Sequence, residues 1–103
     1  MIAIIDEKRA ALEALCVRYH VRRLAIFGSA TDESFDPAES DLDFAVEFAP
    51  LEPYEHKESY FGLLESLVAL FGRAVDLVEY GPIRNPYFLQ ALQESQVMLY
   101  EVA

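Results

Sequence analysis

Two aspartates that alternate with apolar residues are the first feature of the sequence that could carry chemistry. Asp41 and Asp43 lie in the segment SDLDFAVEF, residues 40–48. Alternate residues of a β-strand point to the same side, with Cα atoms about 6.5–7 Å apart, so both carboxylates would share one face of a strand over residues 41–48. Two fixed negative charges repel unless a cation lies between them, and Mg²⁺ typically binds one or two carboxylates together with substrate phosphates. The spacing therefore predicts a magnesium site. The other face of this strand is apolar: Leu42, Phe44, Val46 and Phe48.

The dipeptide Gly28-Ser29 could supply the complementary phosphate site. It follows an apolar run that we expect to be a strand over residues 21–27. A glycine at the end of a strand lets a phosphate approach the backbone closely, and amides at the start of a following helical turn would point at that phosphate. The alternative is a plain turn in which Ser29 caps a helix, and both can hold together. With the aspartates, this turn predicts metal-assisted phosphoryl or nucleotidyl transfer.

Asp76 is a candidate third acid. It lies in AVDLVEY, residues 74–80, which we expect to be another strand. If that strand lies beside residues 41–48, the Asp76 carboxylate could share a second metal ion or accept a proton from an attacking hydroxyl. The pairing of these strands is an assumption at this point. The alternative for Asp41 and Asp43 is the solvated face of an edge strand, but aspartate is disfavoured in strands, which favours a functional use.

The elements that must position these residues alternate between helical and strand patterns. We expect a first helix capped by Asp6, a loop bounded by Pro50 and Pro53, and a short helix and loop over residues 29–40. Gly72 would end a second long helix, and Asn85-Pro86 would begin a third that runs to about Glu94. The order predicts an α+β domain with helices covering a small mixed sheet. The remaining predicted elements are the second helix over residues 59–71 and a last strand over residues 97–102.

Composition restricts the classes of protein to which the chain can belong. Its 103 residues predict a single domain, residues 1–103. A net charge of −10 opposes direct binding to a nucleic acid and suits a protein that holds cations or docks on a basic partner. No apolar run approaches the roughly 20 residues that span a membrane. The only cysteine, Cys16, cannot form an internal disulfide, which fits a reducing cytoplasm. We expect Cys16 to lie in the core, and we expect the same of Phe88.

The order of these motifs resembles the minimal nucleotidyltransferases of the MNT type, in the DNA polymerase β superfamily. Gly28-Ser29, then Asp41-x-Asp43, then Asp76 follow the family pattern. The segments FDPAESDLDF, LFGRAVDLVEY and IRNPYF are similar to the family's versions, so the resemblance covers nearly the whole chain. It implies the nucleotidyltransferase (polymerase β-like) fold. It also implies that Gly28 and Ser29 bind the triphosphate of ATP, and that Asp41, Asp43 and Asp76 form a catalytic triad holding one or two Mg²⁺ ions.

The same resemblance implies a partner. Family members are commonly antitoxins paired with a HEPN-domain ribonuclease toxin, as a hetero-oligomer, and are similar to enzymes that transfer AMP from ATP to a tyrosine of that toxin. One segment departs from the family: many relatives have a basic residue and a glycine soon after Gly-Ser, whereas residues 30–34 here are ATDES. The acids of this segment would lie close to a triphosphate. Two alternatives therefore stay open: an antitoxin that acts by binding alone, and a stand-alone transferase acting on a small molecule.

Overall fold

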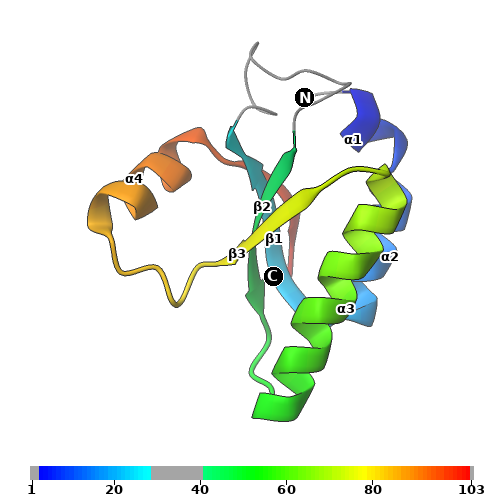
Figure 1. Cartoon of the computed structure of the whole chain (residues 1–103), viewed down its shortest axis with the longest axis horizontal. Helices are drawn as coiled ribbons and strands as arrows, with labels where there is room; N and C mark the ends of the chain where they lie inside the picture. The colour runs from blue at the N-terminus through cyan, green and yellow to red at the C-terminus, as the bar shows by residue number, and fades with distance from the viewer. Residues whose placement is uncertain (1–2, 29–40, 103) are drawn as a thin grey trace.

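A four-stranded mixed sheet with helices on both sides forms the fold (Figure 1). The computed structural model describes residues 3–28 and 41–102. Strand β1 is antiparallel to β2 and β4, and β2 is parallel to β3, so the strand order is β3-β2-β1-β4. This arrangement confirms the predicted α+β class. The elements are α1 (Ala3–Glu7), α2 (Arg9–Arg18), β1 (Val21–Phe27), β2 (Leu42–Phe48), α3 (Pro53–Phe71), β3 (Val75–Glu79), α4 (Pro86–Ser95) and β4 (Val97–Glu101).

The sheet separates two apolar clusters of unequal size. The larger cluster packs the first three helices against one face of the sheet, and it includes the apolar residues of β2 that the alternating pattern placed on one side: Leu42, Phe44, Val46 and Phe48. The smaller cluster, of Ala45, Tyr80 and Leu92, lies under α4 on the other face. Because the β2 side chains alternate between these clusters, the strand is held from behind while its other face carries Asp43.

The helix boundaries differ from the sequence prediction at two places. The N-terminal helical segment is divided in two, and Asp6 lies inside α1 rather than at a cap. Helix α3 begins at Pro53 and not at residue 59, because proline suits the first turn of a helix, where its missing N–H has no partner to lose. The predicted helix start at residue 59 was therefore wrong, while the loop does end at Pro53. The glycine stop at Gly72 and the cap at Asn85 are confirmed.

Both edge strands of the sheet are hydrogen-bonded by side chains from helices. On β3, the Tyr60 hydroxyl of α3 donates to the Leu77 carbonyl at 2.6 Å. On β4, the Arg9 guanidinium of α2 donates to the Leu99 carbonyl at 3.1 Å. Such contacts occupy edge groups that would otherwise pair with another chain, and the bond from Tyr60 also fixes β3 one residue from Asp76. Within the described residues, no helix is long and apolar enough to cross a membrane.

Cys16 is expected to resist thiol reagents as long as the chain is folded. Its side chain is fully buried in α2, and burial, with a smaller effect of Glu13, raises the pKa of the thiol to about 12. Because the thiolate is the reactive species, an aromatic disulfide reagent should leave the native chain unmodified and react with one equivalent of thiol in denaturant. Rapid labelling of the native chain, followed by mass spectrometry, would contradict this placement.

Candidate active site

The parallel pairing of β2 with β3 brings two of the predicted acids together. Asp43 and Asp76 are direct Cα partners in the register of the two strands, so their side chains lie on the same face of the sheet, about one strand spacing apart. Asp41 precedes β2 and is exposed, as is Asp76, while Asp43 is half-buried. The strand pairing that the sequence left as an assumption is therefore present.

The three carboxylates act on one another electrostatically. Burial, followed by the neighbouring charges of Asp76 and Asp41, raises the pKa of Asp43 above its usual value. The rise means that the ionised form of Asp43 is disfavoured where it stands, since desolvation and like charges both oppose a negative group. A cation placed among the three groups would remove this repulsion.

The turn after β1 lies directly against Asp43. Phe27, the last residue of β1, is the Cα partner of Asp43, and Gly28 follows with a φ of 71°. A Cβ atom added to Gly28 would overlap the Asp43 carboxylate oxygen Oδ2. Glycine is therefore required here by its backbone conformation and by the close approach of the carboxylate. Ser29 and the predicted short helix and loop over residues 29–40 lie outside the described residues.

The donor atoms gathered here fit a hard cation that binds together with a nucleotide. Among residues 3–28 and 41–102, no three acidic, histidine or cysteine side chains form a ready-made metal cage. Asp43 and Asp76, with Asp41 nearby, instead supply a partial set made only of carboxylate oxygens. Such a set is typical of Mg²⁺, which retains open positions for water and substrate phosphates. Gly28 lies directly against one of these carboxylates, so a metal ion held there would bring its substrate phosphates close to the turn.

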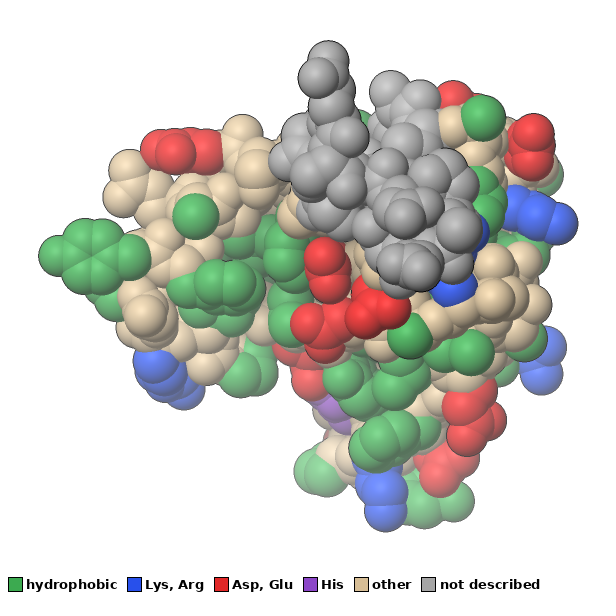
Figure 2. All heavy atoms as spheres, turned by 45° about the horizontal axis from the view of Figure 1, so that its top comes forward, with side chains coloured by type: hydrophobic (Ala, Val, Ile, Leu, Met, Phe, Trp, Pro, Cys, Tyr) green, Lys and Arg blue, Asp and Glu red, His purple; other side chains and the backbone are tan. Residues whose placement is uncertain are grey.

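Helix α4 and its aromatic residues border the acidic site. Figure 2 shows acidic side chains gathered near the centre of one face, with hydrophobic side chains over α4 beside them. The rings of Phe27 and Phe88 meet edge to face, with centroids 6.4 Å apart and an interplanar angle of 83°. Phe88 is 42 % exposed, so the expectation that it lies in the core was wrong. The sequence signal for this neighbourhood was the position of Phe27 immediately before Gly28.

One hydrogen bond ties the end of α4 to the segment that follows β3, and a cap orders the first turn of the helix. The Arg23 guanidinium of β1 lies 4.2 Å from the centre of the Tyr80 ring, and the Tyr80 hydroxyl donates to Gln96 Oε1 at 2.5 Å, just beyond the helix. At the other end, Asn85 Oδ1 accepts hydrogen bonds from the Tyr87 and Phe88 amides at 2.9 and 3.2 Å. The Tyr80–Gln96 bond and the ring contact of Phe27 with Phe88 hold the helix against the sheet.

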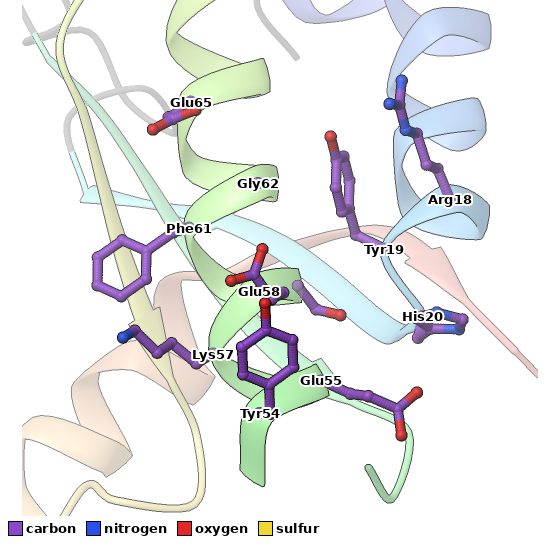
Figure 3. Close-up of a pocket in the computed structure, with 11 residues that line it drawn as sticks. Arg18, Tyr19, His20, Tyr54, Glu55, Lys57, Glu58, Phe61, Gly62 and Glu65 are labelled. Atoms are coloured by element: carbon purple, nitrogen blue, oxygen red, sulfur yellow. The ribbon is translucent and has the colours of Figure 1, made fainter. Parts of the chain in front are cut away.

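A pocket of about 620 Å³ lies elsewhere, between the end of α2 and the first half of α3 (Figure 3). Tyr19 projects between these two helices, and its hydroxyl lies 3.2 Å from Ser66 Oγ. Charges of both signs line the pocket, including Arg18, Lys57 and Glu58. None of the three aspartates lines it, and its mixed charges do not form a phosphate or metal site. Chemistry is therefore assigned to the aspartates and not to this pocket.

Comparisons with known proteins agree on one family. The family model described as nucleotidyltransferase domain matches residues 8–99. A Methanocaldococcus jannaschii protein named as a candidate protein adenylyltransferase, MJ0128, is 37 % identical over 95 residues, which are 91 % of this chain and 92 % of that protein. A solved structure of a candidate minimal nucleotidyltransferase is 25 % identical, with a TM-score of 0.73 and 90 % of each chain covered.

A further solved structure shares the fold. It is described as tri-AMPylated Shewanella oneidensis HEPN toxin in complex with MNT antitoxin, and it is 18 % identical, with a TM-score of 0.63 and coverage of 94 % of this chain and 72 % of that one. The family match over residues 8–99 includes the turn at Gly28 and all three aspartates.

Proposed function

The chain belongs to the nucleotidyltransferase domain family, as a nucleotidyltransferase of the minimal MNT type, and we propose that it transfers AMP from ATP to a hydroxyl of a partner protein. One observation carries the proposal more than any other. Asp43 lies in register with Asp76 and directly against Gly28. A pair of carboxylates beside a turn whose backbone conformation favours glycine suits a metal-bound triphosphate.

In this proposal, Asp41, Asp43 and Asp76 hold one or two Mg²⁺ ions, and Gly28 with Ser29 accommodates the triphosphate. Bound Mg²⁺ would offset the negative charge of the phosphates and stabilise the charge that develops during transfer. The raised pKa of Asp43 supports this arrangement, because its causes include the two other carboxylates. At a pH where all three are ionised, bound Mg²⁺ would relieve their mutual repulsion.

The transfer is an in-line displacement. The acceptor hydroxyl oxygen forms a bond to the α-phosphorus of ATP, the bond from that phosphorus to the oxygen bridging to the β-phosphate breaks, and pyrophosphate leaves. Asp76, which is exposed at the edge strand β3, takes the hydroxyl proton as a general base. The residues of the chain thus orient the triphosphate, while the acceptor is brought by the partner.

We propose a HEPN-domain ribonuclease toxin as that partner, a tyrosine as the acceptor, and an antitoxin role for the chain in the resulting hetero-oligomer. The sequence resemblance to MNT antitoxins supports this choice, as does the shared fold with the antitoxin of the Shewanella complex, whose toxin carries AMP. The net charge of −10 is suited to a basic partner.

The test is transfer of label from α-labelled ATP, with Mg²⁺, to the co-purified toxin. We expect one or more toxin tyrosines to become AMP-modified and pyrophosphate to be released, and both signals to disappear in the double variant Asp41→Asn with Asp43→Asn. Transfer that survives in the double variant would contradict the mechanism. A double variant that transfers no AMP and still protects cells from the toxin would instead show that binding alone neutralises it.

A further inference from the structure

We propose that the exposed ring of Phe88, supported by Phe27, stacks on the nucleobase of the bound nucleotide. This inference rests on the proposed function, because it assigns a place to one part of the ATP molecule. It adds a binding residue on α4, a helix that carries none of the predicted site residues.

The position of Phe27 links the aromatic pair to the acidic site. In an antiparallel ladder, directly paired residues point to the same face, and Phe27 is paired with Asp43. Its ring therefore lies on the same face as the carboxylate that would hold the metal, one strand away. A nucleobase is separated from the α-phosphate by a single ribose. An aromatic ring one strand from the metal-binding acid is at a suitable distance to receive that base.

The ring geometry leaves room for a stacked partner. Phe27 and Phe88 meet edge to face, with an interplanar angle of 83°. In such a pair, the edge of one ring meets the face of the other. Phe88 is 42 % exposed, so its ring presents apolar surface to solvent directly beside the polar site. Aromatic rings placed in this way stack on nucleobases without regard to base identity, since every base has a π-face.

The backbone beneath Phe88 is already ordered. Asn85 Oδ1 accepts hydrogen bonds from the Tyr87 and Phe88 amides, and the Tyr80–Gln96 hydrogen bond holds the far end of the helix. A preformed binding element loses little conformational freedom when its ligand arrives. The aromatic surface is therefore positioned before the nucleotide binds.

The experiment compares ATP with inorganic tripolyphosphate, which has the phosphates and lacks the base. Each is titrated calorimetrically, with Mg²⁺, into the full wild-type chain and into Phe88→Ala, Phe88→Leu and Phe88→Tyr. Phe88→Ala and Phe88→Leu should weaken ATP binding by about tenfold and leave tripolyphosphate binding unchanged. Phe88→Leu keeps apolar bulk against Phe27, so it separates stacking from folding. Phe88→Tyr should retain the affinity for ATP, and Tyr87→Ala, which removes an 82 % exposed ring from the same helix, should change neither ligand.

Three results would overturn the inference. Equal weakening of ATP and tripolyphosphate would mean that Phe88 supports the phosphate site or the fold. Unchanged ATP affinity in Phe88→Leu would mean that no base stacks on this residue. If the same variant also binds the toxin more weakly, Phe88 contacts the partner protein instead of the nucleotide. A wild-type chain that binds neither ligand would reject the proposed function itself, and this outcome is distinct from the first two.

Discussion

Asp43→Asn is expected to raise the melting temperature of the metal-free chain and to abolish Mg²⁺-dependent transfer. Both effects follow from the loss of one negative charge. Asp43 stands half-buried between two other carboxylates, which raises its pKa, so its ionised form costs folding free energy when no cation is bound. The neutral amide removes that cost. It also removes a metal ligand, and the loss of several kcal/mol of charge stabilisation corresponds to a fall in transfer rate of about a thousandfold.

The pH dependence follows from the direction of the shift. The pKa of Asp43 is higher in the folded chain than in the unfolded one, so the folded chain binds the proton more tightly. The destabilisation by Asp43 is therefore fully present above the folded pKa and decreases as the pH falls through it, reaching zero below the unfolded pKa. The difference in melting temperature between Asp43→Asn and the wild-type chain should follow the same course, and scanning fluorimetry over a pH series without metal measures it.

Glu47→Gln is the matched control, because it removes a carboxylate from the same face of β2. Glu47 lies 3.4 Å from the Arg23 guanidinium, so its charge is partly neutralised and its loss should leave the melting temperature unchanged or lower it slightly. It should leave transfer unchanged. An Asp43→Asn chain that melts below wild type without metal, or that still transfers AMP at the wild-type rate, would contradict the assignment of Asp43.

Most of the fold was predictable from local patterns, since the alternation in residues 41–48 and the signals at Gly72 and Asn85 each depend on a few neighbouring residues. The start of α3 was not, because a proline is compatible with a loop and with the first turn of a helix. The exposure of Phe88 also could not be read from its residue type. It depends on how much of the second sheet face α4 covers, which is set by contacts between segments far apart in the sequence, such as Tyr80 with Gln96.

The candidate site was predictable as a set of residues but not as an arrangement. The sequence indicates that Asp41 and Asp43 share a face, because strand periodicity is local. It does not specify which strand lies next to β2, and only the parallel register of β2 with β3 places Asp76 beside Asp43. The contact of Gly28 with the Asp43 carboxylate arises from a third strand, β1. The chemistry therefore depends on three strands whose pairing is a property of the whole sheet.

Gly28→Ala is expected to abolish binding of Mg²⁺-ATP, whereas Gly72→Ala is expected to leave binding intact. Both glycines have a positive φ, 71° at Gly28 and 63° at Gly72. Alanine at either position therefore incurs similar backbone strain of about 1 kcal/mol, which for a domain of this size lowers the melting temperature by about 4–8 °C. The surroundings of the two positions differ. Nothing lies within 4 Å of a Cβ atom at Gly72, while at Gly28 that atom overlaps the Asp43 carboxylate.

The pair therefore separates strain from site geometry. In Gly28→Ala the carboxylate of Asp43 has to move or the turn has to shift, and either change separates the phosphate turn from the metal-binding acids. Scanning fluorimetry should show similar losses of stability in both variants, and calorimetric titration should show lost affinity for Mg²⁺-ATP only in Gly28→Ala. Wild-type affinity in Gly28→Ala would show that the close approach of Gly28 to Asp43 has no part in nucleotide binding. Equal loss of affinity in Gly72→Ala would attribute the effect to instability, since Gly72 ends α3 with no contact to the aspartates.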